Sequence, residues 1–398
     1  MPRPIAYVAA ILFLLGTSVS RSDDGRGLNR GGNANDVSIS GVSSGAAMAA
    51  QYAVAHSGSV VGVGSIAGPG WGCADSSISQ AINACMCGRQ ALVSKVAAAR
   101  KLAASGAVDQ LASGKPRELA RSYVFQSASD ATVVMQSGKA SRNFLSSFIG
   151  RSTVFDNGNA TDDSVHAGHG IISPDGTDSC ESDGKERTYV RRCGAEDNAG
   201  KLFNALYGDG APFDPSKRIS NIPESEVWQF DQQELIDQVK AAGNSVALDM
   251  AWWPFTSPRR SNYDMADVGY IYVPPVCRSA AQGTCRVHVA LHGCKQNAKD
   301  FATTAGYNNW AEYYHAIVVY PAVQPDVPVP EEVCAVPPAS PFLDVGWAKP
   351  NPNGCWDWWG YLDDWSVKKN RYLTNAAPQM QVIERIIDRV TGPLQTPP

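Results

Sequence analysis

The sequence is poor in the features that mark cofactor, nucleic-acid and membrane proteins. Charged residues make up 18% of the 398 residues, and the formal net charge is −4. A typical globular protein has about a quarter, and this weak negative balance gives no basis for a nucleic-acid partner. None of the ten cysteines forms a Cys-x-x-Cys pair, so a zinc site is not expected. The sequence implies no other metal or organic cofactor. Beyond residue 20, no apolar run is long enough to span a bilayer.

The N-terminal segment has the pattern of a secretory signal. Arg3 precedes a short apolar run over 5–15, and Ser18 and Ser20 follow at the spacing that a signal peptidase prefers. We therefore expect a signal peptide over 1–20 and a mature chain over 21–398, with no membrane partner after cleavage. Ten cysteines fit an oxidising compartment and several disulfides. Both observations predict a secreted, extracellular or periplasmic protein.

A Gly-x-Ser-x-Gly pattern lies at 41–45, close to the N-terminus. A strand-like run over 37–40 precedes it, and an alanine-rich segment over 46–58 reads as a helix. Strand, motif and helix together predict a sharp turn that presents Ser43 as a nucleophile. The flanking glycines have a physical task, because side chains there would clash in so tight a turn. A simple Gly-Ser loop is the alternative, and the flanking elements favour the nucleophile.

The strands that usually precede such a serine are missing before it. Further strands are predicted at 59–68 and 120–130, and other strand-like segments and an amphipathic helix lie near the C-terminus, at 269–275, 285–294, 311–322 and 375–392. A circular permutation explains this order, because one sheet would then be built from both ends of the chain, which should lie close together. We predict an α/β fold: a single-domain, circularly permuted α/β-hydrolase over 21–398. It would have a mostly parallel sheet flanked by helices, disulfide stabilisation and no separate substrate-binding domain.

Four segments carry a resemblance to a known family: "SGVSSGA", "GYIYVPPVC", "CRVHVALHGCKQN" and "NPNGCWDWWGY". Together they resemble the secreted poly(3-hydroxyalkanoate) depolymerases, whose catalytic domain is a circularly permuted α/β-hydrolase. The resemblance implies a serine hydrolase of carboxylic esters that acts through an acyl-enzyme. Its substrate would be poly(3-hydroxybutyrate) or a related polyester, as polymer or oligomer.

A serine nucleophile needs an adjacent base. Four of the six histidines are better explained by other positions, at a helix end, inside a strand, in the "LHGC" loop or before a strand: His56, His288, His292 and His315. The resemblance implies loop-shaping near the oxyanion site for His292. His166 and His169 remain, both in "DDSVHAGHGIIS", and the resemblance favours His169.

Asp130, in "SASDATVV", follows a predicted strand and matches the family's placement of the orienting acid. The order Ser, Asp, His is the one that α/β-hydrolases use. A turn-forming role is the alternative for Asp130. Its rivals lie in a polar stretch that reads as a solvated loop: Asp156, Asp162 and Asp163.

The oxyanion of an ester-cleaving serine hydrolase needs two N–H donors. One is expected from Ser44, the residue after the nucleophile. The resemblance places the other on the backbone N–H of Cys294 and implies a Cys294–Cys355 disulfide that would carry Trp356 to the site. It also makes Trp356 the best candidate for a substrate-binding aromatic residue, although several tryptophans of "WDWWGY" are expected in the core.

Two further disulfides are plausible from short spacing, Cys180–Cys193 and Cys277–Cys285. The pairing of the other four cysteines stays open: Cys73, Cys85, Cys87 and Cys334.

Two other functions are weighed against the polyester esterase. A feruloyl or acetylxylan-type carbohydrate esterase, or another secreted carboxylesterase, is the first alternative, but such enzymes usually keep the conventional strand order. A non-catalytic polymer-binding protein that kept the fold is the second. The presence of Ser43, Asp130 and His169 argues against it.

Overall fold

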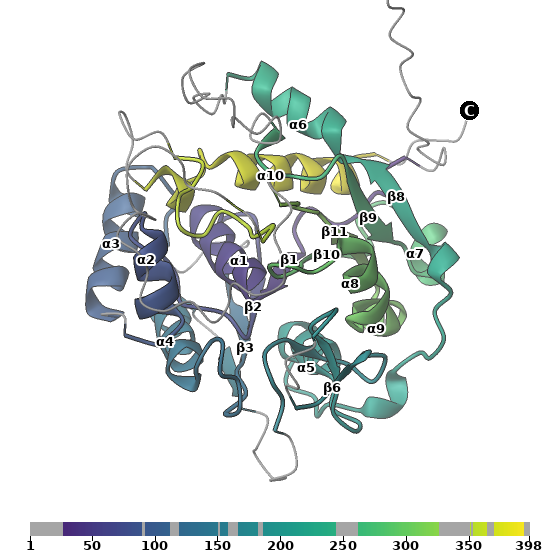
Figure 1. Ribbon diagram of the computed structural model, residues 1–398. Helices are drawn as coiled ribbons and strands as arrows, with labels where there is room; N and C mark the ends of the chain where they lie inside the picture. Colours follow the sequence, from purple (N-terminus) through teal and green to yellow (C-terminus); the bar gives the residue numbers. More distant parts are fainter. Residues whose placement is uncertain are drawn as a thin grey trace, which may run out of the picture.

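The computed structural model describes ten stretches of the chain: 27–89, 92–111, 119–149, 152–157, 166–181, 186–243, 262–325, 351, 353–363 and 370–393 (Figure 1). The predicted signal peptide over 1–20 lies outside these residues. Among the described residues, no helix has both the length and the apolar character that a membrane crossing needs.

An eight-stranded sheet forms the centre of the fold, in the order β4-β3-β2-β1-β10-β11-β9-β8. Parallel pairing joins the strands from β4 to β11, whereas β9 runs antiparallel to both β11 and β8. The strands are β1 Val37–Val42, β2 Gly62–Ile66, β3 Arg121–Phe125, β4 Ser152–Asp156, β8 Val227–Asp231, β9 Val268–Tyr272, β10 Arg286–Leu291 and β11 Ala316–Tyr320. The predicted mostly parallel α/β sheet is therefore present.

The two ends of the described chain meet at this sheet. β1 pairs with β10 in a register that sets Val37 opposite Val287. The N–H of Gly31 donates to the carbonyl of Gly392 at 3.1 Å, and the N–H of Gly32 donates to the carbonyl of Val390 at 3.0 Å. The sheet would run in the usual order, from β8 through β11 to β1 and β4, if the chain were opened before β8 and joined at these ends. This is the arrangement that a circular permutation requires.

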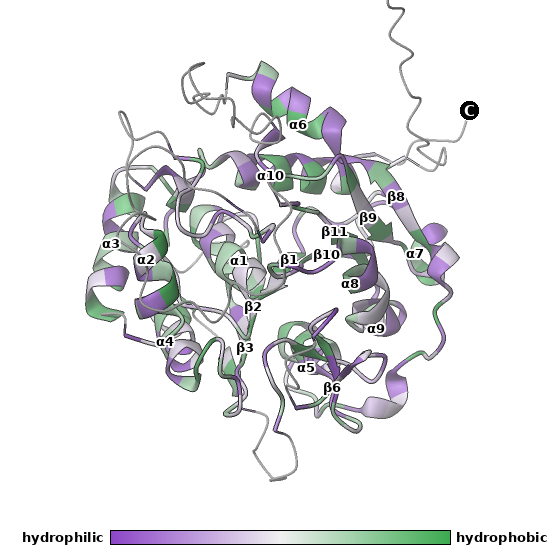
Figure 2. Ribbon diagram, in the orientation of Figure 1, coloured by the Kyte–Doolittle hydropathy of each residue, from purple (hydrophilic) through white to green (hydrophobic). Residues whose placement is uncertain are grey.

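Helices cover both faces of the sheet and bury two apolar clusters (Figures 1 and 2). One face carries α1 Ser44–Ala55, α3 Leu92–Ala104, α4 Met135–Ser146, α6 Gln232–Ala241 and α10 Pro378–Thr391. The other carries α5 Asn198–Tyr207, α8 Ala298–Thr304 and α9 Tyr307–Tyr314. Two short helices, α2 Ile78–Gln80 and α7 Pro275–Arg278, lie in loops. Green and purple residues alternate along α10 in Figure 2, as the predicted amphipathic helix requires.

A small second sheet, in the order β5-β7-β6, packs beside α5. Its strands are only two or three residues long: β5 Ile171–Ile172, β6 Asp178–Ser179 and β7 Val190–Arg192. The Cys180–Cys193 disulfide closes it. We call the described residues 166–181 and 186–193 the histidine lobe.

Two details of the fold differ from the expectations. The strand predicted over 120–130 ends at Phe125, so Asp130 lies in the loop beyond it. Edge strands β4 and β8 and the small sheet are not predicted. The strands of the small sheet are only two or three residues long and show too little alternation for a pattern to appear.

Four disulfides join described cysteines. The expected pairs Cys294–Cys355, Cys180–Cys193 and Cys277–Cys285 are confirmed. Of the cysteines left open, Cys73 pairs with Cys85. Cys334 lies outside the described residues.

Removing the Cys294–Cys355 disulfide is expected to lower the free energy of unfolding by about 4 kcal/mol, because it closes a loop across a sequence separation of 61. The double variant Cys294→Ala/Cys355→Ala would be compared with Cys277→Ala/Cys285→Ala, whose separation is 8 and whose expected loss is about 2.5 kcal/mol. Denaturant unfolding measures both. An equal or smaller loss in the first variant would contradict the loop-length argument.

Candidate active site

Ser43 lies in the turn between β1 and α1 with a strained backbone. Its φ of 55° and ψ of −116° fall in a region that non-glycine residues rarely adopt. The N–H of Ser43 donates to the carbonyl of Ile66 at 2.9 Å, which ties the turn to the end of β2. The Ser43 side chain makes no hydrogen bond as the N-cap of α1. Strand, strained serine and helix therefore form the sharp turn that the motif predicts.

The glycines on either side of Ser43 allow three backbone segments to meet. A Cβ on Gly41 would lie 2.2 Å from the carbonyl carbon of Gly45. A Cβ on Gly45 would lie 2.4 Å from the carbonyl oxygens of both Leu291 and His292. No side chain fits at such distances, so the two glycines bring the turn against the end of β10.

His169 and Asp130 are in direct contact. The Nδ1 of His169 lies 2.8 Å from Oδ2 of Asp130, and both residues are buried. Three further donors hold the carboxylate: the N–H groups of Thr132 and Val133 reach Oδ1 at 2.9 Å, and Nε2 of Gln126 reaches Oδ2 at 3.0 Å. A carboxylate fixed in this way orients the imidazole ring and leaves Nε2 to exchange a proton.

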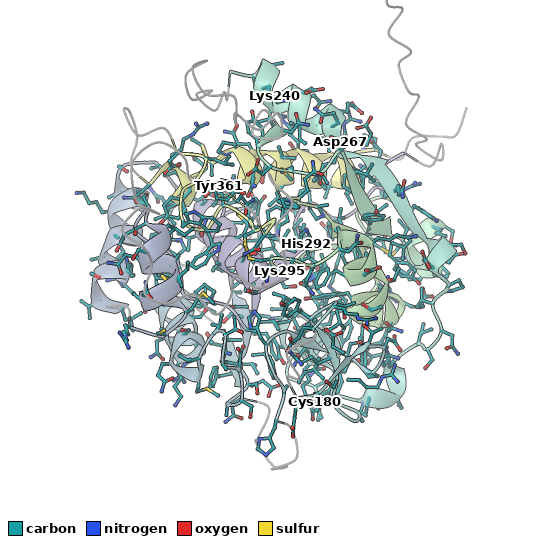
Figure 3. The ribbon with its side chains drawn as sticks, in the orientation of Figure 1. Cys180, Lys240, Asp267, His292, Lys295 and Tyr361 are labelled. Carbon is teal, nitrogen blue, oxygen red and sulfur yellow. A yellow bond between two sulfur atoms is a disulfide. The ribbon has the colours of Figure 1, made fainter. Side chains whose placement is uncertain are left out.

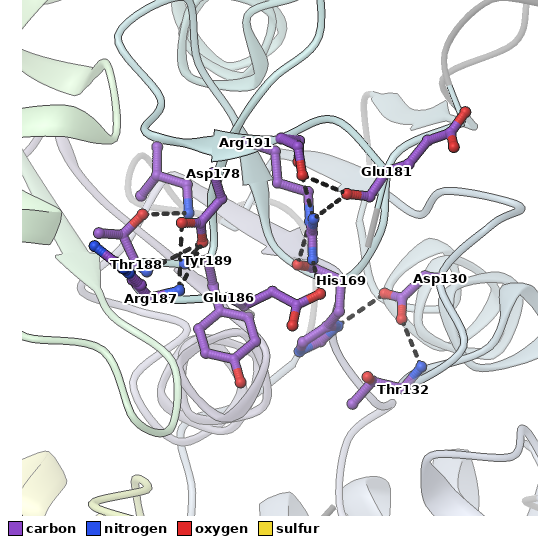
Figure 4. A network of polar contacts seen from close by, with 12 residues as sticks. Asp130, Thr132, His169, Asp178, Glu181, Glu186, Arg187, Thr188, Tyr189 and Arg191 are labelled. Carbon is purple, nitrogen blue, oxygen red and sulfur yellow. Dashed lines mark hydrogen bonds and ion pairs between the residues drawn. The ribbon is translucent and has the colours of Figure 1, made fainter. Parts of the chain in front are cut away.

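A buried arginine supports the backbone of His169 (Figure 4). Arg191, which is 1% exposed, donates through Nε to the carbonyl of His169 at 2.7 Å. Its other nitrogens reach the carbonyls of Ser179 and Glu181 and the carboxylate of Glu186. Because the guanidinium has partners on several segments, the histidine lobe holds His169 in one place.

The backbone N–H groups of Ser44 and Cys294 have no acceptor among the described residues. Ser44 is the first residue of α1, where helical geometry leaves the N–H groups unpaired. Cys294 lies in the loop that follows β10. A Cβ on neighbouring Gly293 would lie 3.2 Å from Cβ of Ser43, so this loop packs directly against the serine. The two unpaired N–H groups could both serve a negative oxygen bonded to the substrate carbon at Ser43.

Neutral His292 holds the loop that carries Cys294, and Figure 3 labels it near the centre of the molecule. Its Nδ1 lies 2.8 Å from the carbonyl of Gly293, and its Nε2 accepts from the N–H of Val323 at 3.1 Å. Complete burial lowers the pKa of His292 to about 4, so the ring stays neutral near pH 7. These two bonds fit the expectation that His292 shapes the loop.

Trp356 packs behind the same loop. It is fully buried, its indole N–H donates to the carbonyl of His292 at 2.9 Å, and its ring lies beside the His292 ring. These contacts make Trp356 a brace for the loop. Contact with substrate stays a prediction for this residue.

Two of the three predicted catalytic side chains follow parallel strands of the main sheet. Ser43 follows β1, Asp130 follows β3, and His169 is bonded to Asp130. Since parallel strands end at the same edge of a sheet, Ser43 and Asp130 lie at that edge, and the contact with Asp130 brings His169 to it. No hydrogen bond joins the hydroxyl of Ser43 to His169 among the described contacts. In unliganded enzymes such bonds often form only when substrate is bound.

The other histidines and acids occupy different positions. His166 is exposed, and its Nδ1 lies 3.2 Å from the hydroxyl of Ser129. His288 is buried across the strand from Ser38 and Ser40, which confirms the expected cross-strand position. His56 is the C-cap of α1, which confirms the expected helix-end position, and its ring packs near Glu384. Asp156 accepts from Tyr123, whereas Asp162 and Asp163 lie outside the described residues.

Sequence reasoning missed three residues that organise the site: Gln126, Arg191 and Gln296. Each is a long polar side chain that the fold buries, and Gln296 is bonded to a distant segment, at Thr188. A signal existed only for Gln296, which stands in the quoted "HGCKQN" segment. Among the described residues, no cluster of histidine, cysteine and acidic side chains could hold a metal ion.

Comparisons with known proteins point in one direction, although no family model matches the chain. It is 27% identical over 361 residues to a poly(3-hydroxybutyrate) depolymerase of Delftia acidovorans, with 89% of this chain and 59% of that protein covered. It is 29% identical over 339 residues to a polyhydroxybutyrate depolymerase of Talaromyces funiculosus, with 83% of each covered. The chain thus spans less than two thirds of the Delftia protein.

Two solved structures share the fold. A PHB depolymerase from Penicillium funiculosum superimposes with a TM-score of 0.64 at 25% identity, covering 93% of this chain and 100% of that one. A serine-to-alanine variant of a PHB depolymerase, complexed with R3HB trimer, gives a TM-score of 0.65 at 25% identity, covering 92% and 99%. In sequence and in fold, the chain is a relative of the polyhydroxybutyrate depolymerases.

Proposed function

We propose that the chain is a serine esterase that hydrolyses the ester bonds of poly(3-hydroxybutyrate), related polyhydroxyalkanoates or their oligomers. The observation that carries the proposal is the His169–Asp130 pair at the sheet edge where Ser43 and two unpaired N–H groups also lie. The relatives named as PHB depolymerases, one of them complexed with R3HB trimer, support the choice of a polyester.

The mechanism follows from these positions. Ser43 Oγ attacks the ester carbonyl carbon while His169 Nε2 takes the hydroxyl proton, and Asp130 stabilises the imidazolium that forms. The carbonyl oxygen becomes an oxyanion held by the N–H groups of Ser44 and Cys294. Collapse breaks the ester bond, and the alcohol product leaves with the proton from His169. Water then attacks the acyl-enzyme with His169 as base, which releases the acid and restores Ser43.

We further propose that the protein acts outside the cytoplasm as a single catalytic domain. Four disulfides fit an oxidising compartment. The domain assignment is supported by β1 and β10, which pair at the centre of one sheet although they lie about 250 residues apart.

Three substrates given to the purified protein test the function: polyhydroxybutyrate film, a feruloyl ester and a short p-nitrophenyl ester. We expect release of hydroxybutyrate that is lost in Ser43→Ala. Release of ferulate alone would indicate a carbohydrate esterase instead. If the folded protein releases no product from any of the three substrates, a binding protein is indicated instead.

A further inference from the structure

We propose that Gln296 is a positioning residue that couples the oxyanion loop, residues 292–296, to the histidine lobe. The proposal rests on the esterase function proposed above. Gln296 is buried, and both ends of its amide are bonded. Its Oε1 accepts from the N–H of Gly293 at 2.5 Å, and its Nε2 donates to the carbonyl of Thr188 at 2.5 Å.

The hydrogen bond between Gln296 and Gly293 fixes a part of the loop that packs against Ser43, the proposed nucleophile. A Cβ on Gly293 would lie 3.1 Å from the carbonyl oxygen of Val42 and 3.2 Å from Cβ of Ser43. Gln296 also takes up the N–H of Gly293, while the N–H of Cys294 keeps no acceptor among the described residues. The side chain therefore fixes which N–H group of the loop is available at the serine.

The hydrogen bond from Gln296 to Thr188 affects the surroundings of His169, the proposed base. Thr188 precedes Tyr189, and the N–H groups of both donate to the carboxylate of Asp178, at 3.1 and 2.7 Å. Tyr189 has a φ of 53°, a strained value that these contacts maintain. Its ring meets the ring of His169 edge-on, with 6.1 Å between the centroids. A shift of Thr188 would therefore be passed to the surroundings of His169 (Figure 4).

Gln296 thus joins two parts of the site that come from separate sheets and lie 108 residues apart in sequence. The oxyanion donors and the base must both be placed relative to one substrate carbon, and misplacement by about 1 Å can cost about 100-fold in rate. Loss of the link should lower kcat and leave KM nearly unchanged, because the error matters most in the transition state.

Gln296→Met tests the proposal because methionine keeps the length of the side chain and removes both hydrogen bonds. Gln232→Met is the matched control. Gln232 is also buried and bonded at both ends of its amide, with Oε1 accepting from the N–H of Ala322 at 3.0 Å and Nε2 donating to the carbonyl of Ala266 at 2.6 Å. It contacts neither the oxyanion loop nor the histidine lobe in these bonds.

On a soluble p-nitrophenyl ester, we expect Gln296→Met to lower kcat about 10- to 100-fold, with KM within about 3-fold and with no greater loss of thermal stability than in Gln232→Met. Equal kcat in the two variants would overturn the proposal while leaving the esterase function standing. A wild-type protein without esterase activity would overturn both.

Gln296→Glu supplies a second test that does not depend on how well Gln296→Met folds. A carboxylate can accept from Gly293 but cannot donate to Thr188, whereas the protonated acid can do both. The ratio of variant to wild-type kcat isolates this proton, because the two proteins differ only at residue 296. We expect the ratio to rise as the pH falls from 8 to 5.5. A ratio that stays flat over this range would overturn the proposal.

Discussion

Replacing His169 with alanine is expected to lower kcat for a soluble ester by on the order of 10⁵-fold or more, the scale seen when a serine hydrolase loses its base. Without the imidazole, no group accepts the hydroxyl proton of Ser43. His166→Ala is expected to stay within about 3-fold of the wild type, because its ring is exposed and contacts Ser129 rather than Asp130.

The two histidine variants form a matched pair, three residues apart in one segment. Initial rates with a p-nitrophenyl ester measure the effect, and circular dichroism checks that both variants fold. The assignment of the base would be wrong if His166→Ala abolished turnover while His169→Ala retained it. If kcat fell only slightly and by a similar factor in both variants, neither histidine would be the catalytic base.

Lowering the pH from 7.5 to 4.5 is expected to reduce the free energy of unfolding by about 5 kcal/mol through two buried histidines alone. Burial lowers the pKa of His288 to about 3 and that of His292 to about 4. Below pH 6.5 the unfolded chain binds a proton at each histidine that the folded chain does not bind, so acid favours unfolding. The stabilising contribution is complete above pH 6.5 and is lost progressively as the pH falls towards these values.

Urea unfolding curves between pH 4.5 and 7.5 measure this loss. Around pH 5 the two histidines contribute a slope of about 2.7 kcal/mol per pH unit, and His288→Gln should remove about half of it. Glutamine does not titrate and can still bond Ser38 or Ser40, the partners of the histidine ring. An unchanged slope in His288→Gln would show that His288 is not the titrating group.

The sharp turn that carries Ser43 could be predicted from the sequence because the residues that it needs are adjacent in the chain. Gly41 and Gly45 stand next to Ser43 in the chain, and the steric reason for them is visible in five residues. Five further strands, β2, β3, β9, β10 and β11, were predicted from their hydrophobic patterns, whereas β4, β8 and the small sheet were not. The strand before Asp130 was predicted too long because the polar loop that holds its carboxylate has no distinct pattern.

The supporting residues could not be predicted in the same way. Arg191 is buried because carbonyls of Ser179 and Glu181 surround its guanidinium, whereas arginine in general is exposed. The role of Gln296 depends on Thr188, 108 residues earlier. The bond of Trp356 to the carbonyl of His292 could not be predicted either, and contact of Trp356 with substrate stays a prediction. Such roles depend on which distant segments meet, and no local pattern records that.

The pairing of β1 with β10 has a consequence for the synthesis of the chain. β1 leaves the ribosome about 250 residues before its β10 neighbour is made. At about 5–20 residues per second, β1 would wait on the order of 10 seconds or longer with an unpaired edge. Contacts this distant in sequence also slow folding itself. The turn that carries Ser43, built on β1, would therefore become rigid only after β10 had been made.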